Sequence, residues 1–100
     1  MAVVNVAEYA VLATNANGGI QIPLGTPLTT YDVAVGSSAT AGPILNLTTK
    51  MVRMNTDVSC RVRLDTSNNV TATDARMAAN QTEYWGVPGP GFMISVITSP

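Results

Sequence analysis

The residues of this chain that could carry acid or base chemistry are its six carboxylates, because the sequence contains no histidine. A glycoside hydrolase needs two carboxyl groups across a cleft, with pKa values that the surroundings have moved. Nothing in the spacing pairs any two of these side chains, and three of them lie among Thr, Ser and Asn residues, where an Asx side chain commonly forms a turn. We therefore predict no enzyme activity. The six residues are Glu8, Asp32, Asp57, Asp65, Asp74 and Glu83.

Metal and nucleophile chemistry is equally poorly supplied. The single cysteine, Cys60, has no partner for a disulfide, and it shares its alternation phase with Val58 and Val62. We predict that it is buried and structural. Without histidine or a second cysteine, the usual zinc and nucleophile–base sets cannot be assembled. The segment 65–69 lacks the glycine and the glutamate of a calcium loop. We predict no cofactor and no metal site.

The elements that would position these residues are β-strands. Apolar and polar residues alternate over 51–54 and 58–64, which is the period of a strand with one buried face. Further strands are indicated at 20–24, 44–48, 83–87 and 92–97, with a strong turn signal at 15–19. For residues 73–81 we favour an extended segment over a helical turn capped by Asp74. The pattern predicts an all-β domain, a small β-sandwich or jelly-roll-like barrel of about seven to nine short strands.

The composition favours a protein whose surface meets other proteins. The chain has 100 residues, enough for a single domain spanning 1–100, and 46% of them are hydrophobic. Only 11% are charged, against about 25% in ordinary soluble domains. With a net charge of −1, self-repulsion is weak. We expect a homo-oligomer or a component of a larger assembly; the alternative is a soluble domain with an uncharged Thr/Asn surface.

Residues 1–17 are apolar and carry Glu8 as their one charge. They have neither the basic start of a signal peptide nor the ~20 apolar residues of a membrane span, so we expect no membrane partner. One interpretation is an extended arm or a strand that pairs with a neighbouring subunit. The alternative is an ordinary first strand of the domain. The anchors of such an arm would be Val4, Val6, Val11 and Leu12.

All five cationic residues fall between positions 50 and 76. The alternation predicts that Arg53, Arg61 and Arg63 point away from the core, with a solvated sheet face as the simplest reading. A nucleic-acid site would need a basic balance and aromatic residues among the cations, and this chain has neither there. Because arginine is enriched at protein interfaces, we favour a surface that binds protein.

Tyr84 and Trp85 precede a Pro-Gly-Pro-Gly corner at 88–91. The two rings could form a platform on which a sugar stacks. More commonly, a lone tryptophan beside a turn covers the end of a β-core. A carbohydrate-binding adhesive module is therefore kept as an alternative function.

Several segments together resemble small structural proteins of tailed-bacteriophage virions. They are the opening Val6-Ala7-Glu8-Tyr9-Ala10-Val11-Leu12, the run Val52-Arg53-Met54-Asn55-Thr56-Asp57, the loop Thr71-Ala72-Thr73, and the stretch Arg76-Met77-Ala78-Ala79-Asn80-Gln81-Thr82-Glu83-Tyr84-Trp85-Gly86-Val87-Pro88-Gly89. Trp85 stands where that pattern prefers Phe, and residues 15–50 add little. The resemblance implies a head decoration (cement) protein, made in the host cytoplasm and carried on the capsid surface. Its partner would be the major capsid protein or another virion protein. A head–tail or tail accessory role is the alternative.

Overall fold

The computed structural model describes residues 2–10, 12–14, 21–23 and 25–99, with side chains described outside 11–24. Every regular element in these ranges is a β-strand, which confirms the predicted all-β class. The turn predicted at 15–19 lies outside the described residues. The strands are β1 (Val3–Tyr9), β2 (Leu12–Thr14), β3 (Gln21–Pro23), β4 (Thr29–Ala34), β5 (Thr40–Ala41), β6 (Met51–Thr56), β7 (Cys60–Asp65), β8 (Ala75–Met77), β9 (Thr82–Gly86) and β10 (Met93–Thr98).

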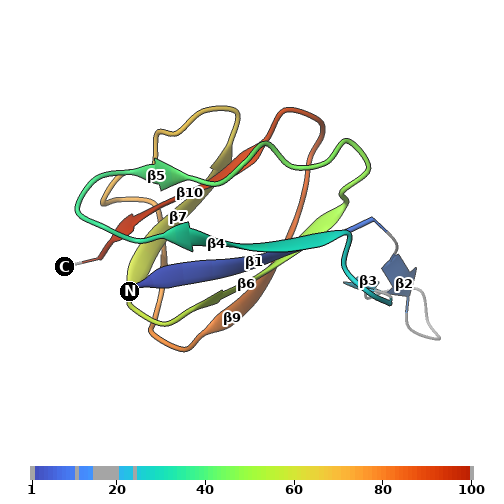
Figure 1. The fold of residues 1–100 in the computed structure, drawn as a ribbon, viewed down its shortest axis with the longest axis horizontal. Coiled ribbons are helices and arrows are strands. Elements are labelled where there is room, and N and C mark those ends of the chain that lie inside the picture. The colour runs from blue at the N-terminus through green and yellow to red at the C-terminus, as the bar shows by residue number, and fades with distance from the viewer. Residues whose placement is uncertain (1, 11, 15–20, 24, 100) are drawn as a thin grey trace.

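Eight of the strands form two antiparallel sheets of four. The first sheet has the order β4-β1-β6-β9 and the second has the order β5-β10-β7-β8. Strands β2 and β3 pair only with each other, and this hairpin lies beyond one end of the first sheet (Figure 1). The start of β1 and the end of β10 lie near each other at the opposite end (Figure 1).

Strand β1 is an internal strand of the first sheet, between β4 and β6. Its β-branched valines suit a pleated surface, and alternation sends Val4 and Val6 inward, where both are fully buried. They belong to the core of their own chain, so the expectation that they anchor an arm on a neighbouring subunit is wrong. The alternative, an ordinary strand of the domain, describes β1.

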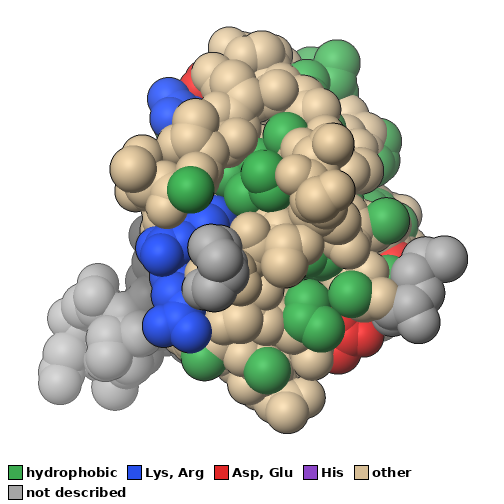
Figure 2. Space-filling view, turned by 90° about the vertical axis from the view of Figure 1, so that its left-hand side faces the viewer, with side chains coloured by type: hydrophobic (Ala, Val, Ile, Leu, Met, Phe, Trp, Pro, Cys, Tyr) green, Lys and Arg blue, Asp and Glu red, His purple; other side chains and the backbone are tan. Residues whose placement is uncertain are grey.

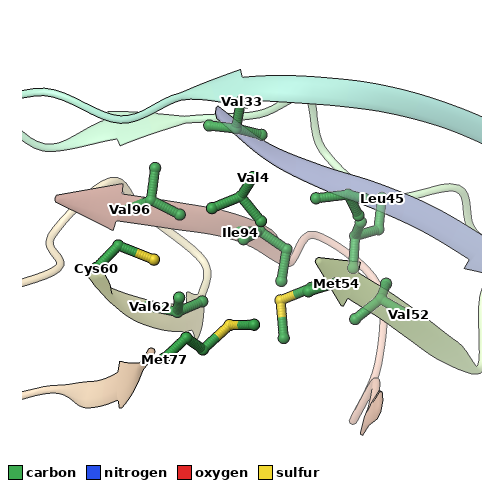
Figure 3. Packing of buried hydrophobic residues seen from close by; sticks show 11 residues of the cluster. Val4, Val33, Leu45, Val52, Met54, Cys60, Val62, Met77, Ile94 and Val96 are labelled. Carbon is green, nitrogen blue, oxygen red and sulfur yellow. The ribbon is translucent and has the colours of Figure 1, made fainter. Parts of the chain in front are cut away.

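The core lies between the two sheets. Val4, Val33 and Met54 come from the first sheet, and Met77 and Ile94 come from the second (Figure 3). Burying a side chain of this size contributes about 1.5–3 kcal/mol relative to leaving it exposed. Cys60 is among the buried residues, with no exposed surface, as its alternation phase predicts.

The chain crosses from one sheet to the other at residues 57–59. Asp57 holds this turn against β1, because its Oδ1 accepts a hydrogen bond of 2.9 Å from the N–H of Val3. The Thr56 hydroxyl donates to the carbonyl of Val58 at 2.7 Å. Strand β8 confirms the expected extended conformation only for residues 75–77, because residues 78–81 form a turn before β9. The Asp74 carboxylate accepts a hydrogen bond from the N–H of Thr71 at 2.8 Å. Within the described ranges, no helix has the length and hydropathy to cross a membrane.

Candidate interaction surfaces

The most unusual polar group of the molecule is a buried carboxylate. Alternation along β1 gives Glu8 the same inward direction as Val4 and Val6, and its side chain is only 1% exposed. Its Oε1 accepts hydrogen bonds from the Thr49 hydroxyl (2.7 Å), the Asn46 N–H (2.8 Å) and the Asn46 side-chain amide (3.1 Å). A buried charge without hydrogen-bond partners is very costly, so the fold has to keep these three hydrogen bonds. They tie β1 to the loop between β5 and β6.

That loop, residues 42–50, presents apolar side chains to solvent. Leu45 is buried in the core, and its N–H donates to the Phe92 carbonyl at 2.8 Å. Its neighbours point the other way, with Ile44 62% and Leu47 85% exposed. Leu28, which is half exposed, is also tied to Glu8, because its N–H donates to the Glu8 carbonyl at 2.7 Å. We name Leu28, Ile44 and Leu47 the apolar rim.

Sequence reasoning missed the apolar rim. The alternating residues 44–48 were expected to form a strand, but they form a loop without strand pairing. The physical reason is the hydrogen bonding of Asn46 and Thr49 to Glu8, which lies about forty positions earlier in the chain. The available signal was the acidic residue at an inward position of a strand, since such a residue needs polar partners.

Tyr31 lies beside the same carboxylate. The pKa of Tyr31 is raised above its usual value, chiefly because burial opposes ionisation and also because of the nearby charge of Glu8. Its hydroxyl is buried and makes no hydrogen bond of ordinary geometry to any described residue. Ionisation of Tyr31 therefore opposes folding.

The three candidate arginines point away from the core, as predicted, but they do not share one surface. Arg53 lies on the outer face of the first sheet, with Ala7 and Tyr84 opposite it on the two neighbouring strands. Arg61 and Arg63 lie on the outer face of the second sheet. The strip of Lys and Arg side chains in Figure 2 runs along one side of a surface that is otherwise mostly uncharged.

Two of these arginines organise their own loop. Arg63 forms ion pairs with Asp65 (2.9 Å) and Asp74 (3.2 Å), and Arg61 donates to the Asp74 carbonyl at 3.2 Å. The pKa of Asp65 is lowered, first because it accepts the Thr66 N–H and then because of Arg63. These contacts hold the ends of the segment between β7 and β8, which gives Arg63 a structural role within the chain.

The aromatic pair does not form a platform. Adjacent strand residues face opposite sides, so Tyr84 is 52% exposed on the outer face while Trp85 packs against the core. The Trp85 indole N–H donates to Glu83 at 3.0 Å, and the Gln81 amide also donates to Glu83. Trp85 covers the end of the core, which was the commoner of the two readings.

The remaining candidate residues are the four apolar residues of the N-terminal segment and Cys60. Val4 and Val6 are core residues, as described above, while Val11 lies outside the described residues. Leu12 begins β2, and its side chain is outside the described part. Cys60 is buried, and burial raises the pKa of its thiol. No group of three or more His, Cys, Asp or Glu that could hold a metal ion occurs among the described residues.

Residues 52–57 and 82–89, two of the segments on which the sequence resemblance rests, are neighbours in the fold. Val52 lies opposite Trp85, and Arg53 lies opposite Tyr84, in the antiparallel pairing of β6 with β9. These two segments therefore form one pair of adjacent strands in the first sheet. Comparisons with protein-family models, with curated proteins and with solved structures find no match for this chain.

Proposed function

We propose that this chain is a structural protein of a tailed-bacteriophage virion, a decoration (cement) protein that binds the capsid shell through the apolar rim. The observation that carries the proposal is the exposure of Ile44 and Leu47 on a loop whose backbone and side chains are fixed by the buried Glu8. The partner is the major capsid protein, and the chain acts on the outside of the head as a homo-oligomer.

The physical advantage of such a loop is that it is ordered before binding. Association loses affinity when flexible side chains and loops must be immobilised, so a pre-ordered loop retains more of the free energy of apolar burial. The anchoring of Leu45 in the core and of Asn46 to Glu8 supplies this order. A contact of standard size, about 800 Å² on each partner, would also stabilise the shell by binding only its assembled form.

The scarcity of free surface charge supports the same proposal. Among the few charged residues, Glu8 is buried, and Arg63 forms ion pairs with both Asp65 and Asp74. The surface seen in Figure 2 is mostly uncharged. A desolvation penalty from unpaired charges would therefore be small when a large part of this surface is covered.

We further propose that the two sheets form a jelly roll, a fold built from two four-stranded antiparallel sheets. In support, the chain changes sheet at nearly every connection from β4 onward: β4 to β5, β5 to β6, β6 to β7, β8 to β9 and β9 to β10. The exception is the pair β7 and β8, which are neighbours in one sheet. If β4 is taken as the first strand of the jelly roll, its last strand is β1, which comes from the beginning of the chain.

A head–tail or tail accessory role would use the same apolar rim with fewer copies. The carbohydrate-binding alternative needs two rings on one face, and no observation favours it because Tyr84 and Trp85 face opposite sides.

The protein composition of purified particles tests the proposal. We expect the chain in copy numbers comparable with the major capsid protein, and deletion of its gene should lower the temperature at which heads release DNA. Absence from particles would refute the virion role, and presence in about a dozen copies or fewer would refute the head decoration role.

A further inference from the structure

The two sheets have four edge strands, and only one of them lacks the features that normally prevent pairing with another chain. Short strands and charged side chains are the common protections of a sheet edge. Strand β5 has two residues, and β8 has three and carries Arg76. Strand β4 carries the exposed Asp32 near its middle. Strand β9 has five residues, and its outward-facing positions Thr82, Tyr84 and Gly86 are all exposed and uncharged.

The register of β9 shows which of its backbone groups are free. The N–H of Val87 donates to the Lys50 carbonyl at 2.9 Å. In an antiparallel pair, hydrogen-bonded and non-hydrogen-bonded positions alternate, so Trp85 and Glu83 bond to β6 through their backbone groups. The N–H and C=O groups of Thr82, Tyr84 and Gly86 then point away from β6. None of them has another backbone partner among the described residues.

We propose that β9 pairs antiparallel with β9 of a second copy of this chain, about a two-fold axis through Tyr84. Tyr84 then lies opposite Tyr84 of the second copy, and Thr82 lies opposite Gly86 of the second copy. Each such pair exchanges both of its backbone hydrogen bonds. The first sheets of two molecules become one continuous sheet, and the closed two-fold symmetry leaves no free β9 edge for further growth.

The sequence around Tyr84 fits a copy of itself. The outward positions carry no charge, so the pairing brings no like charges together. Glu83, the one charged residue of β9, faces the inner side and is already bound by Gln81 and Trp85. The exposure of Thr82, Tyr84 and Gly86 leaves this edge open to an opposing strand. Because proline cannot donate to a ladder, Pro88 ends the pairing shortly after Gly86.

This inference goes beyond attachment to a shell, because it concerns how two copies meet through a surface separate from the apolar rim. A chain that fails to dimerise through β9 could still bind particles through Leu47, and a chain that binds no particle could still dimerise. The two proposals are therefore tested independently.

A cysteine scan of β9 tests the register directly. At a hydrogen-bonded antiparallel position the two Cα atoms are about 5.5 Å apart, within the range of about 4.4–6.8 Å that a disulfide spans. We expect Tyr84→Cys to form a covalent dimer under mild oxidation. Thr82→Cys is the matched control, because two copies of residue 82 would be about four residues apart along the strands, roughly 13 Å. The native Cys60 is fully buried and should not compete.

Equal cross-linking of Tyr84→Cys and Thr82→Cys, or none with either in a folded protein, would overturn the proposal. A second measurement uses sedimentation equilibrium of the whole chain. Tyr84→Lys places two ammonium groups opposite each other and should weaken the dimer at least tenfold. Thr30→Lys adds the same charge at an exposed position of the β4 edge and should leave the dimer unchanged. A wild-type chain that stays monomeric, and whose β9 amides become protected only with a different protein, would rule out the second copy as the occupant.

Discussion

The Oε1 atom of Glu8 accepts a hydrogen bond of 2.7 Å from the hydroxyl of Thr49 in a part of the protein that solvent does not reach. The same oxygen accepts two further hydrogen bonds from Asn46. A strand near the beginning of the chain thus fixes a loop in its middle. The exposed side chains of Ile44 and Leu47 owe their positions to this fixation.

Replacing Glu8 tests this relationship. Glu8→Gln keeps the shape of the side chain but removes the charge that strengthens all three hydrogen bonds. We expect the free energy of unfolding in urea to fall by about 1–3 kcal/mol. Hydrogen exchange at the Asn46 amide should accelerate more than exchange in β7.

Asp32→Asn is the matched control for this change. Asp32 is an exposed carboxylate that accepts a hydrogen bond from the Asn5 side chain at 3.0 Å. Its replacement should change stability by less than about 0.5 kcal/mol. Equal effects of the two substitutions would show that burial of Glu8 does not distinguish it.

Cys60 is expected to resist labelling in the folded state. Its side chain has no exposed surface, and its thiol lies 3.6 Å from the Thr56 hydroxyl, a distance suited to sulfur. In Cys60→Ser, the shorter C–O bond would leave the new hydroxyl too far from that partner, at a cost of about 1–3 kcal/mol. Rapid modification of the native thiol by a bulky reagent, with the fold retained, would contradict the burial.

The Arg63–Asp65 pair predicts an acid-sensitive loop. The pKa of Asp65 is lowered in the folded state, so its contribution to stability is present above the unfolded value of about 3.9. This contribution is lost as the pH falls through the folded pKa. We expect Arg63→Gln to raise the pKa of Asp65, as measured by NMR titration. An unchanged titration would show that Arg63 does not contribute to lowering the pKa of this carboxylate.

Tyr31 predicts a loss of stability at high pH. Because its pKa is raised in the folded state, the unfolded chain releases the phenol proton first as the pH rises above about 10. The free energy of unfolding should therefore fall in that range, and less steeply in Tyr31→Phe. At neutral pH, Tyr31→Phe should change stability by less than about 1 kcal/mol, because the hydroxyl makes no hydrogen bond of ordinary geometry to a described residue. Tyr84→Phe, which replaces an exposed tyrosine, is the matched control and should lose stability at high pH as the wild type does. If Tyr31→Phe also lost as much stability as the wild type, Tyr31 would not be the source of the loss.

The sequence was informative wherever a single strand decided the outcome. Alternation alone placed Cys60 and Val62 inward and Arg61 outward, since the side-chain period of a strand is local. The same pattern could not show that β6 and β7 belong to different sheets. The sheet to which a strand belongs depends on distant pairing, and Arg53 was therefore separated from Arg61 and Arg63 only by the fold.

The apolar rim could not be predicted for a related reason. Residues 44–48 have the alternation of a strand, but Asn46 and Thr49 find their partner in Glu8, far away in the sequence. Val4 and Val6 were proposed as interface anchors because their segment is apolar and nearly uncharged. Those properties fit an internal strand equally well, and pairing with both β4 and β6 decided between the two.

The most direct test of shell binding is the addition of purified chain to heads that lack it. We expect wild-type protein to bind these heads to saturation, and Leu47→Asp to lose at least tenfold in affinity, because it places a charge in the centre of the apolar contact. Ala79→Asp, which adds the same charge at an exposed turn beside the far end of β6, should bind like the wild type. Equal binding by Leu47→Asp and the wild type, with both proteins folded, would contradict the proposal that the apolar rim holds this protein on the capsid.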